Sequence, residues 1–138
     1  MVVERSPRPS KARLDGKLVK LLFHTRHDRG MTLIEHASRC VRQGELHEVV
    51  STDQLDAQAG SRIDRVGFIG FVEIQQAGVI ERGDLLWSGD ACLGWVLGFD
   101  ECHFPNHYNI LIATHRLMTA DTLNDAGIGS VLHFEEQR

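Results

Sequence analysis

Residues 66–74 read Val-Gly-Phe-Ile-Gly-Phe-Val-Glu-Ile, and this stretch decides the fold class. β-Branched and aromatic residues dominate it, as they do in β-strands. Gly67 and Gly70 lie inside it, which is typical of strands that bend or carry a bulge. A second stretch of the same kind follows at 92–99, where Cys-Leu-Gly-Trp-Val-Leu-Gly-Phe again contains two glycines. The sequence therefore predicts two long strands with irregularities.

Shorter apolar or alternating segments on both sides of these stretches indicate further strands. Turn-forming pairs such as Ala77-Gly78 and Ser88-Gly89 separate several of them. Strands at short spacing with glycine-rich turns predict a mostly β (α+β) chain, a small closed or half-closed β-barrel of about seven strands. The additional strands are expected at 17–24, 45–50, 85–87, 106–114 and 130–134.

One or two short helices are expected beside the strands. In residues 31–43 the apolar positions fall at helical spacing, Thr32 and Glu35 form a capping-box pair, and Gly44 would end the helix. A strand over residues 31–34 is the alternative there. Residues 51–61 are either a loop or a loop with a short helix at 52–58, and residues 119–125 fit one or two helical turns.

The length of 138 residues corresponds to one domain, expected at 14–138. It follows a basic stretch at 1–13, where Pro7 and Pro9 oppose regular structure and indicate a flexible arm. No apolar run approaches the roughly 18 residues of a membrane-spanning helix, and the first residues lack the apolar segment of a secretory signal. Three cysteines without a CxxC pair favour a reducing cytoplasm.

The charge is divided unevenly along the chain. The net charge is −4, yet residues 1–42 hold ten Lys/Arg against four Asp/Glu, and residues 43–138 hold five against fifteen. The acidic remainder and the lack of aromatic residues among the early basic ones argue against nucleic acid as a partner. We expect the two oppositely charged halves to attract each other within the fold or across a homodimer. A homodimer is expected because small barrels often pair.

The second half of the chain carries a family resemblance. The pattern Ile80-Glu-Arg-Gly-Asp-Leu85, Gly89-Asp90, Val96-Leu-Gly-Phe99, Thr122-Leu-Asn-Asp-Ala-Gly127 and Ser130-Val-Leu-His-Phe134 resembles the IIA component of the sorbitol-specific phosphotransferase system. Over about residues 66–134 this resemblance implies a small, largely β barrel. That family carries its phosphoryl group on a His in a short strand, and the matching strand here has Gly70 and Val72 instead. The resemblance therefore supports the barrel without a phosphocarrier role.

The richest cluster of reactive side chains lies at 100–109, Asp-Glu-Cys-His-Phe-Pro-Asn-His-Tyr-Asn. Pro105 makes this a loop that enters a strand, and a turn there would place His103 beside His107. With an extended backbone from residue 106, His107, Asn109 and His115 would share one face. His103, His107 and His115 are the candidate metal ligands, and Asp100, Glu101 or Cys102 could complete an open site for zinc, iron or nickel.

The same loop can be interpreted without a metal. His103 or His107 would then be a general acid or base, with Asp100 or Glu101 orienting it. Candidate ligand-binding residues are Tyr108 and Asn109 in the loop, and Arg26 and His27 in the polar segment 24–30. In that segment Arg26 and Arg29 suit a small anionic ligand. A solvated loop at a barrel rim, without chemistry, is the third interpretation.

Together these features predict a cytoplasmic small-molecule-binding protein or accessory enzyme with a His-rich polar site at residues 100–109. The alternative is a non-catalytic homodimeric interaction or regulatory module on a barrel like that of the phosphotransferase IIA component. Neither nucleic acid nor a membrane is an expected partner.

Overall fold

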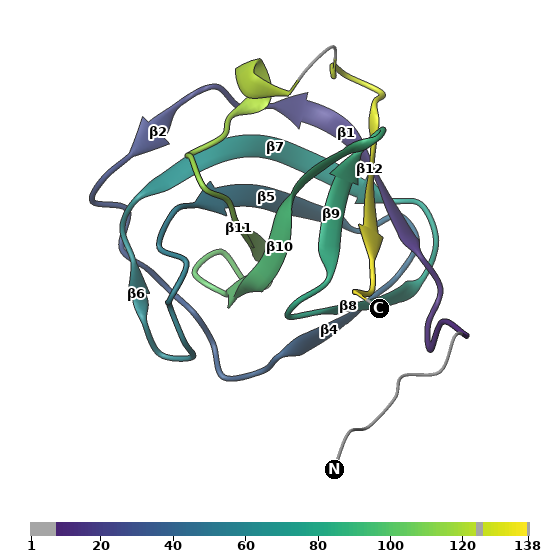
Figure 1. Ribbon diagram of the computed structural model, residues 1–138, viewed down its shortest axis with the longest axis horizontal. Coiled ribbons are helices and arrows are strands. Elements are labelled where there is room, and N and C mark those ends of the chain that lie inside the picture. The colour runs from purple at the N-terminus through teal and green to yellow at the C-terminus, as the bar shows by residue number, and fades with distance from the viewer. Residues whose placement is uncertain (1–7, 124–125, 138) are drawn as a thin grey trace.

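The computed structural model describes residues 8–123 and 126–137, and β-strands account for nearly all of its regular structure (Figure 1). One 3-10 turn, η1 (Ala120–Thr122), is the only helical element among those residues. The strands are β1 (Leu14–Leu21), β2 (Thr25–Arg26), β3 (Met31–Thr32), β4 (Ser38–Val41), β5 (Leu46–Thr52), β6 (Arg62–Ile63), β7 (Val66–Ile74), β8 (Gly78–Glu81), β9 (Leu85–Ser88), β10 (Ala91–Asp100), β11 (Asn109–Ala113) and β12 (Val131–Glu135).

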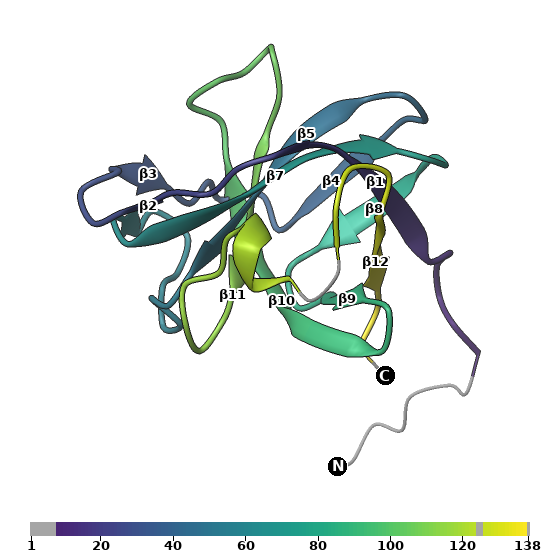
Figure 2. The ribbon, with the colours of Figure 1, turned by 90° about the horizontal axis from the view of Figure 1, so that it is seen from above.

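Seven strands form a ring-like sheet in the order β1-β12-β9-β10-β11-β5-β7, and β7 pairs back onto β1. Neighbouring strands are antiparallel except β5 and β11, which run parallel. The short β2 pairs antiparallel with the beginning of β7, and the pairs β3–β6 and β4–β8 lie beside the ring (Figures 1 and 2). The predicted mostly β class is confirmed.

Two apolar clusters lie on opposite faces of the β5–β11 pair. Val49 and Ile110 belong to the first cluster, to which all seven strands of the ring contribute, so that cluster fills the interior. Val50 and Leu111 point the other way, into a second cluster covered by the β3–β6 pair. Because both faces are buried, β11 carries consecutive apolar residues after Asn109, and Val49 and Val50 are adjacent in β5, where a half-exposed strand would alternate.

The helix predicted over residues 31–43 is wrong. This segment instead supplies β3, which pairs with β6, and β4, which pairs with β8. Its apolar residues serve different clusters: Leu33 packs in the second cluster and Val41 in the first. The apolar spacing that suited one helical face therefore reflects residues that pack into two different clusters of the core.

The other helix predictions also fail or shrink. Residues 52–58 contain no helix, so the loop interpretation holds after β5 ends at Thr52. Residues 119–125 contain only the turn η1, and residues 124–125 lie outside the described part of the chain. Most of the proposed arm, residues 1–7, also lies outside it, whereas Lys11 contacts the sheet through Asp84, with 2.5 Å between Nζ and Oδ2.

Glycines mark the predicted strand irregularities. Register shifts occur where β1 meets β7 near Gly70, and where β10 meets its neighbours near Gly94 and Gly98. Gly70 has φ of 157°, and a Cβ built on it would lie 2.2 Å from the carbonyl oxygen of Lys20. No side chain fits at that position, and Val72 is fully buried in the first cluster.

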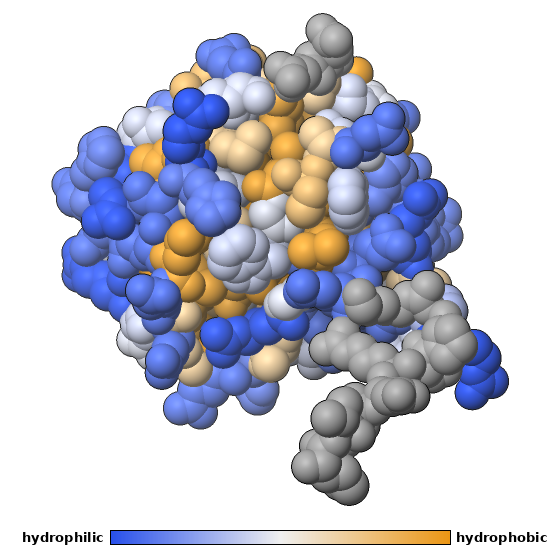
Figure 3. Space-filling model, viewed as in Figure 1, coloured by the Kyte–Doolittle hydropathy of each residue, from blue (hydrophilic) through white to orange (hydrophobic). Residues whose placement is uncertain are grey.

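The face shown in Figure 3 gathers apolar side chains near its middle, with hydrophilic residues around them. The segment that joins β11 to η1 crosses this face (Figure 1). Its Leu117 and Met118 line a recess of about 360 Å³ together with Leu93.

Among the described residues no helix has the length and apolar character that crossing a membrane requires.

Candidate functional site

The loop between β10 and β11 projects from one side of the ring, next to β5 (Figure 2). Backbone N–H groups of Asn106 and His107 donate to the carbonyl oxygen of His103, at 2.8 and 3.4 Å, and so fold the loop back at Pro105. The rings of His103 and His107 stack with centroids 5.0 Å apart. The expected juxtaposition of these two imidazoles is therefore present.

Strand register places three polar side chains in a row beneath this loop. Glu48 on β5 is paired with Asn109 on β11, and Asn109 is paired with Asp100 on β10. Residues paired across adjacent strands point to the same face of a sheet. All three are buried, so this row is a polar strip in an otherwise apolar wall.

Asp100 anchors the base of the loop. Its Oδ1 accepts hydrogen bonds from Asn109 Nδ2 and from the Cys102 backbone N–H, both at 2.9 Å, and its Oδ2 accepts one from the Thr32 N–H at 2.8 Å. Burial opposes ionisation of this carboxyl, but the hydrogen bonds outweigh it and lower its pKa below the usual 3.8. Asp100 thus joins three segments as an ionised acceptor.

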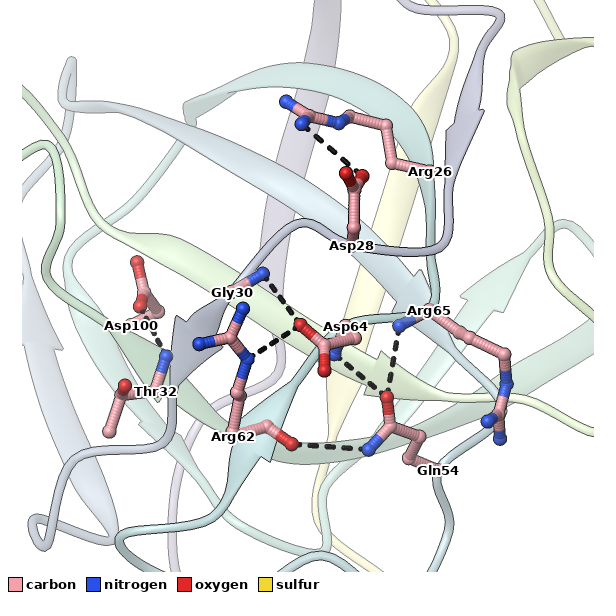
Figure 4. Close-up of polar contacts among 9 residues, drawn as sticks. All are labelled: Arg26, Asp28, Gly30, Thr32, Gln54, Arg62, Asp64, Arg65 and Asp100. Atoms are coloured by element: carbon pink, nitrogen blue, oxygen red, sulfur yellow. Dashed lines mark hydrogen bonds and ion pairs between the residues drawn. The ribbon is translucent and has the colours of Figure 1, made fainter.

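A network of hydrogen bonds around Asp64 holds the segment before β3 in place, and Thr32 in β3 itself is bonded to Asp100 (Figure 4). The N–H of Arg29 donates to the carbonyl oxygen of Asp64, and the N–H of Gly30 donates to Asp64 Oδ1 at 3.0 Å. Asp64 is fixed in turn by Arg62 Nε at 2.8 Å and, through its own N–H, by Gln54 Oε1 at 2.8 Å. The side chain of Arg29 therefore leaves from a well-anchored backbone.

Arg29 brings a positive charge to His103. Its Nη2 lies 3.0 Å from His103 Nε2 and 3.4 Å from Cys102 Sγ. The sequence predicts Arg26 and His27 as ligand-binding residues and suggests Arg29, with Arg26, for an anionic ligand. Arg26 instead pairs with Asp28 at 3.3 Å, and both Arg26 and His27 are exposed.

Glu48, His103 and His107 form a candidate metal centre. Each offers one ligand atom, and the three atoms lie within 4.8 Å of one another. His107 Nε2 lies 3.8 Å from Glu48 Oε1 and is buried without a hydrogen-bond partner, while its Nδ1 is 2.7 Å from the Asn106 amide nitrogen. The donor set of two imidazoles and one carboxylate is one that zinc and iron(II) use in proteins.

Burial sets the protonation of this centre. It raises the pKa of the Glu48 carboxyl above 4.5, with Arg29 opposing the shift and Asp100 adding to it. It lowers the pKa of His107 below 6.5, the neighbouring His103 and His47 lower it further, and the nearby Asn109 side chain opposes the shift. Burial, with Asp100, also raises the pKa of the Cys102 thiol above 9.0. Both Glu48 and His107 are therefore biased toward their uncharged forms.

His115 is not part of the centre, contrary to the sequence prediction. Strand β11 begins at Asn109 and ends at Ala113, so residues 107, 109 and 115 do not share one strand face. His115 is exposed at the far end of β11, where its ring meets the edge of Trp95 and lines the recess beside Leu117. A strand that separates His107 from His115 cannot bring both to one ion.

The remaining predicted residues surround the centre. Glu101 forms an ion pair with Arg39, whose guanidinium lies 4.3 Å from the centroid of the Tyr108 ring. Tyr108 stacks on His47, with ring centroids 5.2 Å apart, and its N–H donates to His47 Nδ1 at 3.1 Å. Asn109 is fully buried and serves Asp100, so it holds the loop and is not open to a ligand.

Sequence reasoning missed Glu48. The signal available was a polar pair, His47 and Glu48, directly before Val49 and Val50 in the strand predicted at 45–50. A buried carboxylate in such a strand needs a partner. The parallel pairing of β5 with β11, which joins segments far apart in the chain, is what supplies His107.

Comparisons with known proteins give a family without an assigned role. The comparison with curated proteins and the comparison with solved structures each find no match. Residues 8–136 match the family described as "Family of unknown function (DUF6917)", and the chain belongs to that family.

Proposed function

We propose that this chain is a cytoplasmic small-molecule-binding protein or accessory enzyme whose site holds a divalent transition metal. Glu48, His103 and His107 are the ligands. The observation that carries the proposal is the buried, unpartnered Nε2 of His107, which faces Glu48 Oε1 at 3.8 Å. Two ligand atoms on one tetrahedral zinc are about 3.4 Å apart, so a small adjustment admits an ion.

A metal would remove the cost of this arrangement. A buried nitrogen without a partner costs roughly 1–3 kcal/mol, and a desolvated carboxyl next to it adds to that cost. Coordination satisfies both groups at once, and the anchored loop holds His103 in place for the third bond. Zinc, iron or nickel suits two imidazoles and one carboxylate.

Three protein ligands leave coordination positions for water or a ligand. A bound divalent metal lowers the pKa of its water or polarises a carbonyl, which makes hydrolysis or isomerisation the reaction class. Arg29 reaches His103 at 3.0 Å, so its guanidinium lies beside any anionic group bound there. This supports a small anionic ligand.

The metal content of untagged protein tests the proposal. Elemental mass spectrometry of the wild type should give close to one zinc, iron or nickel per chain. His107→Ala and Glu48→Gln should lose it, while the control His115→Ala should keep it. Wild-type protein that holds none of these metals after incubation with each, or metal that persists in His107→Ala, contradicts the proposal.

A second candidate function is a homodimeric interaction or regulatory module on a small barrel like that of the phosphotransferase IIA component. The ring-like strand order and the apolar face in Figure 3 favour it. Size-exclusion chromatography with light scattering should then show a dimer that Leu117→Glu converts to a monomer. With Gly70 and Val72 in place of His, incubation with the general phosphotransferase proteins should leave the chain unlabelled.

A further inference from the structure

A recess of about 230 Å³ adjoins the candidate metal centre. It lies between the beginning of β5 and the loop residues 104–108. His107 lines this recess and also belongs to the metal cluster, so its imidazole is the shared wall of the two. A ligand atom bound to the metal would therefore have the recess next to it.

Large apolar side chains stand exposed around this recess. Leu46 is 48% exposed and Phe104 is 54% exposed, and both line it. They are two of the five large hydrophobic residues that are exposed among the described residues. Burying this apolar surface against a ligand is favourable in free energy, because water is then released from both partners.

The aromatic wall of the recess is held in place by its surroundings. The Tyr108 ring has Phe104 at 5.4 Å and His47 at 5.2 Å between centroids, and the Arg39 guanidinium at 4.3 Å from its centroid. His47 is fixed by Glu45, with 2.8 Å between Nε2 and Oε1. A wall fixed before binding costs a ligand little conformational entropy.

The size of the recess limits its occupant. Pockets for drug-sized ligands measure about 300–1,000 Å³, and this recess is smaller. One aromatic ring or one short branched alkyl group is what it can hold. On the other side of the centre, Arg29 supplies a positive charge, 3.0 Å from His103.

We propose that the site takes small monoanionic acids that carry one aromatic or short branched alkyl group. The acid group binds the metal beside Arg29, and the apolar group enters the recess against Phe104, Leu46 and Tyr108. This assignment of a ligand class rests on the metal centre proposed above. The recess is then the element that selects among acids that share the same metal-binding group.

Two hydroxamates distinguish the contribution of the metal-binding group to affinity from that of the apolar group. Acetohydroxamate and benzohydroxamate chelate a metal through the same atoms and differ by a methyl against a phenyl group. On protein loaded with zinc, calorimetry should show benzohydroxamate binding at least about tenfold more tightly. Phe104→Ala should remove most of that difference and leave acetohydroxamate unchanged. The control Phe23→Ala removes an equally exposed phenyl ring that does not line the recess, and it should preserve the difference.

A metal-free arm distinguishes the two proposals. With a chelator present, benzoate titrated into labelled protein should still shift the NMR signals of Leu46 and Tyr108, and Phe104→Ala should abolish the shift. If benzoate gives these shifts but the protein binds no metal, the ligand-binding role of the recess stands and the metal centre is overturned. Equal affinities of the two hydroxamates on zinc-loaded protein, or no benzoate shifts at the recess, would overturn the ligand class while leaving the metal centre intact.

Discussion

The buried Nε2 of His107 faces Oε1 of Glu48 at 3.8 Å and has no hydrogen-bond partner among the described residues. The two residues come from a loop and a strand that meet only because β5 and β11 pair in parallel. Burial biases both toward their neutral forms. A site that is unfavourable when empty and favourable around a cation is what a metal centre requires.

The pH dependence of stability should reveal Glu48. Its pKa is raised above 4.5, so its contribution to the free energy of unfolding is present below pH 4.5 and is lost as pH rises through the raised value. Glu48→Gln removes that loss. Urea denaturation with EDTA present should show the variant gaining stability relative to wild type as pH rises from 4.5. A difference that stays constant with pH would show that Glu48 is not desolvated.

His107 should show the opposite sign. Its pKa lies below 6.5, so its contribution is present above pH 6.5 and is lost as pH falls through the lowered value. His107→Gln, again with EDTA, should therefore gain stability relative to wild type as pH falls below 6.5. His36 is exposed, so His36→Gln is the control variant. A matching trend in both variants would contradict the role of burial.

Asp100 should matter mainly for stability. Asp100→Ala leaves the donors of Thr32, Cys102 and Asn109 without their acceptor in a buried place. Each unsatisfied donor costs about 1 kcal/mol or more, so we expect a loss of about 3 kcal/mol in urea denaturation. The exposed Asp28 is the control, and Asp28→Ala should cost less than about 0.5 kcal/mol. Comparable losses in the two variants would contradict the anchoring role.

The backbone at Gly70 should tolerate no side chain. A Cβ there would lie 2.2 Å from the Lys20 carbonyl oxygen, so Gly70→Ala must push β1 away from β7. We expect a loss of at least about 3 kcal/mol in thermal or chemical denaturation. Gly83 has φ of 92° with open space around it, so Gly83→Ala should cost only about 1 kcal/mol. Equal costs would show that the β1–β7 contact is looser than described.

Local patterns predicted the strands well because β-branched and aromatic residues are concentrated in them. Residues 66–74 coincide with β7, and the glycine-containing stretch 92–99 lies inside β10. The predicted strand at 45–50 overlaps β5. The helix at 31–43 failed because Leu33 and Val41 pack in separate clusters, and a spacing pattern does not show which cluster a side chain enters.

The site was predictable only where it is local. His103 and His107 lie in one loop, and a turn at Pro105 was enough to bring them together. The sequence suggests Arg29 for an anionic ligand, but it does not show that Arg29 and Glu48 join the two histidines. They do so through the contacts of Asp64 and the β5–β11 pairing, which link segments far apart in the chain. His115 was placed with them on the assumption of a longer strand.

Arg29 should oppose the metal and favour the anion. Its guanidinium lies 3.0 Å from His103 Nε2, so it repels a cation at the centre and attracts an acid bound there. Arg29→Met should therefore raise zinc affinity and lower acetohydroxamate affinity on the zinc-loaded protein, each by roughly tenfold at low salt. Competition with a chromophoric chelator measures the first and calorimetry the second. Arg26→Met, which alters an exposed arginine paired with Asp28, should change neither affinity. If both affinities fall together in Arg29→Met, Arg29 holds the loop in place and its charge is not what the site uses.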